Sequence, residues 1–220
     1  MSTYMRTSGD VLRWPDSPDA RAALTEWFAD SSVGAYLSGD SLDFRGADLS
    51  RLDLAGAYLA GSQLAGVRFE AANLGDANLS NAEAQGADFS GADLAKADLV
   101  GCAADAARFG SARLFAAHLD DAVLADADLS RAILNSAKLY KTDLRGANLE
   151  YASLRWCTLG GPSMPTVLSG ARMFGCQLDG ATGAVVGPVF VNEAATRSLG
   201  GAELERWLSA QGAQGVQVLG

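Results

Sequence analysis

Residues 87–101 read ADFSG ADLAK ADLVG, three consecutive five-residue units that share a small residue, a polar residue and a large apolar residue. The spacing continues from Phe44 to Leu159, where every fifth residue is Leu, Phe or Ala and none of the twenty-four positions is polar. A period of five fits neither the 3.6-residue period of an amphipathic helix nor the two-residue period of a strand. The chain must therefore turn after each short apolar segment, which is typical of a solenoid.

A second period inside the first gives the number of units in one coil. Three Phe residues lie twenty apart, and so do two Ala residues that replace the usual Leu: Phe69, Phe89, Phe109, Ala84 and Ala104. We therefore predict that four units form one coil and that residues n and n+20 stack. Phe44 stands outside this pattern. Each of the two Ala residues precedes a Phe by one unit, so the wide ring is expected to fill space that the small residue leaves.

One triplet recurs in register along the chain, as Ala-Asp-Leu at 47–49, 92–94, 97–99 and 127–129 and as Ala-Asn-Leu at 72–74, 77–79 and 147–149. With these triplets the chain resembles the pentapeptide-repeat family over residues 42–160 and, with weaker matches, over 166–182. The resemblance implies an all-β solenoid, a right-handed quadrilateral β-helix. Its central Leu or Phe and the preceding small residue would point inward.

The ends of the chain break the repeat and divide it into three segments. Residues 1–40 are predicted to hold a helical cap that begins at Ser17-Pro18-Asp19, an N-cap followed by Pro at the first helical position. Residues 41–182 form the β-helix, interrupted by a loop near 161–166. Residues 183–220 form a capping and dimerisation segment with a helix at about 201–211. We expect short helical caps at both ends, because a solenoid must cover its terminal cores.

Composition and motifs argue against an enzyme, a membrane protein and a direct nucleic-acid binder. No apolar run reaches the length of a membrane span and no signal-peptide core is present, so a cytoplasmic location is expected. The three cysteines occupy inward small positions, and His118 lies at an outward position without a catalytic partner, so we predict no catalytic residue, metal site or cofactor: Cys102, Cys157 and Cys176. The net charge of −9 disfavours contact with phosphates.

Charge is unevenly distributed along the repeat. Residues 76–128 hold ten acidic and three basic residues, a net charge of −7, whereas residues 129–160 have a net charge of +3. The acidic residues are a candidate partner-binding surface: Asp76, Glu83, Asp88, Asp93, Asp98, Asp105, Asp120, Asp121, Asp126 and Asp128. An alternative interpretation is that they only keep the rod soluble. Four aromatic residues at outward positions would add anchors, and Tyr151 and Trp156 would equally well cover the loop near 161: Phe115, Tyr140, Tyr151 and Trp156.

The resemblance extends to the Qnr- and MfpA-type quinolone-resistance members of the family, which are similar to B-form DNA in size and charge. It implies a non-enzymatic protein that binds DNA gyrase or topoisomerase IV by DNA mimicry and gives antibiotic resistance. It also implies a homodimer through the C-terminal segment. That segment has more apolar residues than a terminal cap needs, and we expect them to form the dimer surface: Leu204, Trp207, Leu208, Val216 and Val218. The alternative is a general protein–protein scaffold or adaptor unrelated to DNA.

Overall fold

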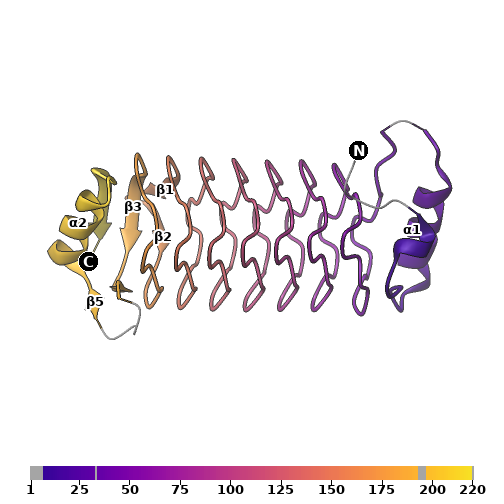
Figure 1. The fold of residues 1–220 in the computed structure, drawn as a ribbon, viewed down its shortest axis with the longest axis horizontal. Helices are drawn as coiled ribbons and strands as arrows, with labels where there is room; N and C mark the ends of the chain where they lie inside the picture. The colour runs from indigo at the N-terminus through magenta and orange to yellow at the C-terminus, as the bar shows by residue number, and fades with distance from the viewer. Residues whose placement is uncertain (1–6, 33, 193–196, 220) are drawn as a thin grey trace.

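The middle of the molecule is a rod of stacked coils. The computed structural model describes residues 7–32, 34–192 and 197–219. Helix α1 (Pro18–Ala29) lies at one end of the rod and helix α2 (Gly201–Ala210) at the other (Figure 1). Parallel bridges join positions twenty residues apart, from Ser38 with Tyr58 to Lys138 with Thr158. This spacing confirms that four five-residue units make one coil.

Each coil has four faces, and each face carries one ladder of bridged residues along the rod. The bridged residue directly precedes the central Leu or Phe. We name the faces by three successive members of their ladders: face A has Asp43, Gln63 and Glu83, face B has Asp48, Arg68 and Asp88, face C has Asp53, Asn73 and Asp93, and face D has Tyr58, Asn78 and Asp98. The two residues that follow each central position form a corner, named by the faces it joins. The second corner residue adopts a positive φ, as in Lys96 at 59°.

The core of the rod consists of the central residues and the small residues two positions earlier. The rings of Phe69, Phe89 and Phe109 are stacked, with centroids 5.1 and 4.8 Å apart, and the preceding Ala84 is fully buried. Phe44 also has a small residue at the central position one unit earlier, where the chain has Gly39. A β carbon at Gly39 would lie 2.7 Å from Cζ of Phe44.

We expect Ala84→Leu to lower the free energy of unfolding by about 1–3 kcal/mol, because the larger side chain overpacks a coil that already holds Phe89. Phe89 has a stacked ring on both sides, which restricts its movement. Chemical denaturation of Ala84→Leu, and of the double variant Ala84→Leu with Phe89→Leu, tests whether a smaller side chain at position 89 restores the lost stability. A double variant no more stable than the single one would contradict the overpacking of this coil.

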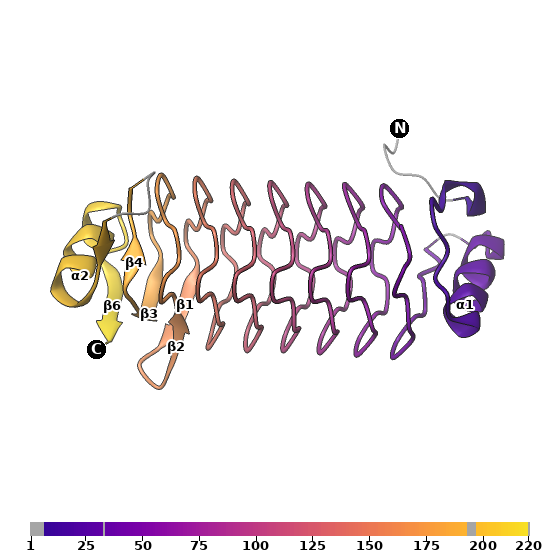
Figure 2. The ribbon, with the colours of Figure 1, turned by 90° about the horizontal axis from the view of Figure 1, so that it is seen from below.

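Residues 158–167 form a hairpin instead of the loop predicted near 161–166. Strand β1 (Thr158–Gly161) pairs antiparallel with β2 (Met164–Val167), so only Pro162 and Ser163 form the turn. The hairpin projects from the side of the rod (Figure 2). Beyond it the bridges join residues twenty-four apart, as in Asp143 with Val167. The insertion therefore adds four residues to one coil, which explains why the later repeats are in a shifted register.

The N-terminal segment packs on the start of the rod. Ser17 caps α1 by accepting a hydrogen bond from the backbone N–H of Ala20, and Pro18 begins the helix, which confirms the predicted start. Leu24 and Trp27 are buried in a core that is continuous with the rod. The short helix η1 (Ser8–Asp10) precedes α1, and Arg13 bridges Asp48 antiparallel, which covers the first rung of face B.

The C-terminal segment continues the stack with short strands. Strand β3 (Thr182–Val186) pairs in parallel with β1 and β2 on one side and with β6 (Gly215–Leu219) on the other. Strand β4 (Val189–Phe190) pairs with β5 (Ser198–Leu199). Helix α2 matches the helix predicted at about 201–211. Within the described ranges, no helix combines the length and the apolar character that crossing a bilayer requires.

Candidate interaction surface

The fold distributes the ten predicted acidic residues over all four faces. Five precede a central residue and belong to the ladders: Glu83 on face A, Asp88 and Asp128 on face B, Asp93 on face C and Asp98 on face D. The other five lie at corners: Asp76 at corner CD, Asp105 and Asp126 at corner AB, and Asp120 and Asp121 at corner DA. Proximity in the sequence therefore does not place all ten on one surface.

The four ladder aspartates have a structural role within their own units. Each accepts a hydrogen bond from the backbone N–H two residues later, at 3.0–3.1 Å: Asp88, Asp93, Asp98 and Asp128. Asn78 does the same for Ser80. Asp and Asn stabilise turns in this way because their short side chains reach the backbone two residues on. This geometry explains why the repeat alternates between Asp and Asn at this position.

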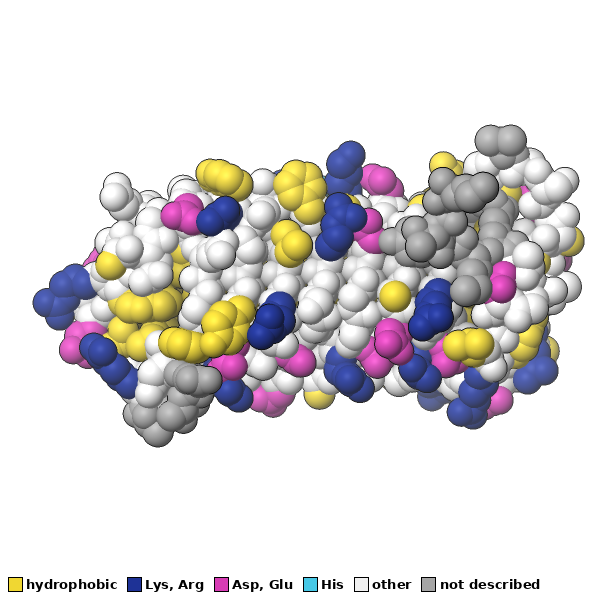
Figure 3. All heavy atoms as spheres, in the orientation of Figure 1, with side chains coloured by type: hydrophobic (Ala, Val, Ile, Leu, Met, Phe, Trp, Pro, Cys, Tyr) yellow, Lys and Arg dark blue, Asp and Glu magenta, His cyan; other side chains and the backbone are white. Residues whose placement is uncertain are grey.

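Cations from the next coil neutralise several of the same acids. Arg108 pairs with Asp88 at 3.5 Å, Arg113 with Asp93 at 2.6 Å and Lys141 with Asp121 at 2.7 Å. On face B, Arg68 also pairs with Asp48 of the preceding coil, so Asp and Arg alternate along this ladder. Figure 3 shows one side of the rod, on which acidic, basic and hydrophobic side chains are mixed. Such mixed surfaces do not present a uniform negative field.

Face A and its two corners differ from the rest of the rod. They hold Glu83, Asp105, Asp126, Asp120 and Asp121, and no Lys or Arg occurs on them between the coils of Arg45 and Lys141. We name these five acids the face A strip. Among the described residues, Glu83, Asp105 and Asp126 make no side-chain hydrogen bond or ion pair, whereas Asp120 accepts the backbone N–H of Tyr140. Between them the ladder residues are Ala103 and Val123, whose side chains carry no charge.

The electrostatics of neighbouring groups agree with this placement. The hydrogen bond from Arg145 to Asp143 is the main reason that the pKa of Arg145 is raised, and the charges of Asp105 and Asp126 add to the effect. The same bond is the main reason that the pKa of Asp143 is lowered. Asp143 therefore stays ionised but paired, at the C-terminal border of the strip.

The predicted aromatic anchors are exposed but do not gather on the strip. Trp156 is 61% exposed, and Phe115, Tyr140 and Tyr151 are 36–46% exposed. Tyr151 and Trp156 do not cover the loop near 161: they lie over Gly175 and Gly180 of the next coil, where a side chain would collide with their rings. The glycines leave room for the aromatic rings, and Tyr36 lies over Gly56 in the same way.

The residues considered for chemistry occupy structural or solvent-facing positions. All three cysteines are buried and unpaired, and burial raises the pKa of each thiol to about 12: Cys102, Cys157 and Cys176. Thiols with so high a pKa stay protonated and are poor nucleophiles or metal ligands. His118 is exposed on face D, between Asp98 and Lys138. Over the described ranges, no three His, Cys, Asp or Glu side chains converge on a metal site.

Three of the five predicted dimer residues are buried inside the chain. Leu204 and Leu208 are fully buried, and Val216 is 4% exposed, because α2 packs on β6. These three side chains are therefore not available to a second copy in this structure. Trp207 and Val218 keep part of their surface. The apolar stripe predicted the amphipathic helix, but the surface that covers it belongs to the same chain.

The sequence matches the family model for pentapeptide repeats, with eight copies, over residues 42–75, 72–110, 112–150 and 124–161. The chain therefore belongs to the pentapeptide repeat family. Proteins of this family fold as right-handed β-helices and are generally structural or binding proteins without enzymatic activity. No curated protein gives a significant sequence match to this chain.

Several solved structures are similar to this chain. A trypsin-treated form of QnrB1, a plasmid-mediated fluoroquinolone resistance protein, is 19% identical with a TM-score of 0.57, over 86% of each chain. A second trypsin-treated form is 21% identical with a TM-score of 0.53, over 78% of this chain and 77% of QnrB1. HetL, involved in heterocyst differentiation regulation in the cyanobacterium Nostoc sp. strain PCC 7120, is 27% identical with a TM-score of 0.48, over 69% of this chain and 78% of HetL. The likeness to QnrB1 is one of fold.

Proposed function

We propose that the protein is a non-enzymatic rod that binds a protein partner through the face A strip. The observation that carries the proposal is that five acidic side chains lie on face A and its two corners, where Lys and Arg are absent over several coils. Three of these acids make no hydrogen bond or ion pair with the described residues, so their charge is available to a partner. A basic surface on the partner is the complement, because opposite fields steer association.

The specific partner we propose is DNA gyrase or topoisomerase IV. The protein would then protect that enzyme against quinolones. Two features support it: the fold is similar to that of QnrB1, and the strip is negative, as DNA is. A DNA-binding groove recognises a row of negative charges. The strip, and not the acidic middle as a whole, is the part of the rod that resembles DNA in this respect.

A general scaffold or adaptor is the second candidate. It is favoured by the structural role of the ladder aspartates, which need no partner to explain their presence. We also propose that α1 and α2 cap the right-handed quadrilateral rod in either case. Support comes from Leu24 and Trp27 of α1 and from Leu204 and Leu208 of α2, which are buried against the ends of the stack.

The test compares two variants that remove the same charge. The strip variant carries Glu83→Gln, Asp105→Asn and Asp126→Asn, and the control carries Glu26→Gln, Asp76→Asn and Glu205→Gln, acids outside the strip. In gyrase supercoiling assays with and without a quinolone, we expect the strip variant to need about tenfold more protein for the same effect, since exposed charge contacts contribute about 0.2–1 kcal/mol each. The control should match the wild type.

Equal loss in both variants would show that the net charge of the protein, and not the position of the acids on face A, determines the effect on gyrase. No effect of the wild-type protein on either topoisomerase would remove the DNA-mimic function and leave the scaffold. Rising salt should weaken the wild-type effect, because exposed charges are screened over about 8–10 Å at 0.1–0.15 M salt.

A further inference from the structure

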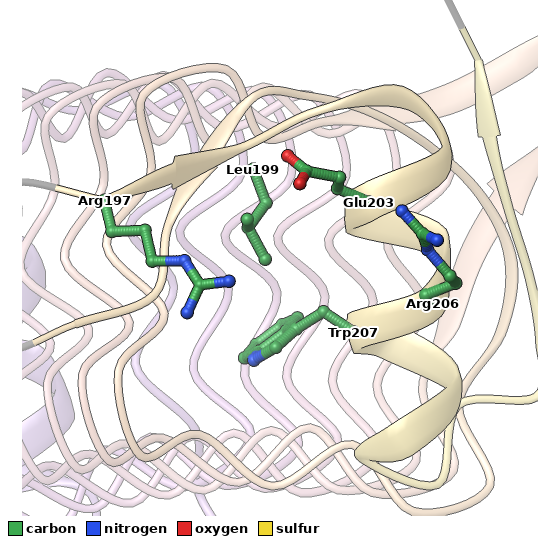
Figure 4. A pocket seen from close by; sticks show the side chains of 5 residues that line it. All are labelled: Arg197, Leu199, Glu203, Arg206 and Trp207. Carbon is green, nitrogen blue, oxygen red and sulfur yellow. The ribbon is translucent and has the colours of Figure 1, made fainter.

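A cavity lies at the C-terminal end of the molecule, away from the face A strip. Its volume is about 320 Å³, and five residues of β5, α2 and the segment before β5 line it: Arg197, Leu199, Glu203, Arg206 and Trp207. In Figure 4, Leu199 and Trp207 lie between the two arginines, and the guanidinium group of Arg197 points toward the Trp207 ring. The volume is at the lower end of the range for small-ligand pockets, about 300–1,000 Å³.

The charges that line this cavity have no ionic partner in the described part of the chain. The ion pairs among the described residues all involve other side chains, and neither arginine pairs with Glu203. The Nε of Arg206 donates to the carbonyl of Ala202 at 3.2 Å, which anchors its stem on α2. The backbone N–H of Arg197 donates to Oδ1 of Asn192 at 2.8 Å, which holds the backbone of Arg197. Both guanidinium groups keep free donors.

The rest of the cavity is apolar. Leu199 is 4% exposed, and the indole of Trp207 is half-buried on the same side. Helix α2 is held in place because Leu204 and Leu208 on an adjacent side of the helix are buried. An indole presents a flat apolar surface on which an aromatic or aliphatic group packs well. The cavity therefore offers cationic donors beside a firm apolar wall.

We propose that this cavity binds a carboxylate carried on a small apolar body, such as an aromatic acid or the last residue of a peptide with an apolar side chain. Guanidinium groups match carboxylates in geometry and donate charge-assisted hydrogen bonds. Two arginines and one glutamate leave a net charge of +1 at the cavity, which suits a monoanion. A monoanion neutralises this charge, whereas a phosphate dianion would leave the occupied cavity with a net charge of −1. Leu199 and Trp207 hold the apolar body.

The test uses the full-length protein and matched probes. Phenylacetate and an acetylated Gly-Phe dipeptide carry the free carboxylate, whereas phenylacetamide and the amidated dipeptide are neutral and of the same shape. Two-dimensional NMR spectra should show shifts of the Trp207 indole and Arg197 Nε signals with both acids and not with the amides. If phenylacetate binds and the dipeptide acid does not, the ligands of the site are small acids. If both acids bind, the ligands also include the C-termini of peptides.

Variants then identify the groups that bind. Arg197→Gln and Arg206→Gln should each weaken the binding of phenylacetate by about tenfold, the scale of a charge-assisted hydrogen bond. Arg51→Gln is the control, because Arg51 is an exposed arginine outside the cavity with no ion pair to a described residue. Equal binding of phenylacetamide, equal loss in the control, or no shift of the Trp207 signal would overturn the proposal. None of these results bears on the gyrase assay.

Discussion

Replacing Phe89 by alanine should lower the free energy of unfolding by about 3–5 kcal/mol, the usual cost of truncating a buried aromatic side chain. The ring is fully buried and stacks on Phe69 at 5.1 Å and on Phe109 at 4.8 Å. Removing it leaves a cavity in the middle of the rod and takes away both ring contacts. Coils of a solenoid contact only their neighbours, so few other contacts compensate.

Phe115→Ala is the matched control for this change. Phe115 lies in the same part of the rod but is 44% exposed at a corner. Its truncation should change stability by less than about 0.5 kcal/mol, as is usual for surface positions. Urea denaturation followed by circular dichroism measures both variants. Similar losses at the two positions would show that the stacked rings do not dominate the core of the rod.

The repeat and the period of twenty could be predicted from the sequence because they depend on local residue spacing. Buried positions recur every five residues, and the Phe stack marks which units lie above one another. The start of α1 could also be predicted, because Ser17 and Pro18 act on the first turn of the helix itself. The hairpin was not: Gly160 and Gly161 signal a turn, but the pairing of Gly160 with Pro165 depends on the surrounding coils.

The interaction surface was only partly predictable. Acidic composition does not distinguish an aspartate that bonds to its own turn, such as Asp98, from one that projects into solvent, such as Asp126. The alternation of Asp with Asn in the triplets was the available signal, because only a hydrogen-bonding role accepts either residue. The C-terminal cavity gave no sequence signal, since Arg197 comes to the same site as Trp207 only through the packing of β5 and α2.

Gly183 is a position where the stack has no room for a side chain. It lies in β3, opposite Leu159 of β1, and has a φ of +118°. A β carbon there would overlap the carbonyl oxygen of Gly160 and lie 2.9 Å from the carbonyl carbon of Leu159. All the colliding atoms belong to the backbone of the neighbouring rung, so no rotamer change relieves the contact.

Gly183→Ala should therefore lower the free energy of unfolding by about 2–6 kcal/mol, the sum of about 1–3 for the backbone conformation and about 1–3 for overpacking. Gly66→Ala separates the two causes, because Gly66 also has a positive φ, 68°, but no atom within 4 Å of the added carbon. That control should lose only about 1 kcal/mol. Denaturation of both variants measures the difference, and equal losses would show that the close approach of β3 to β1 does not restrict this position.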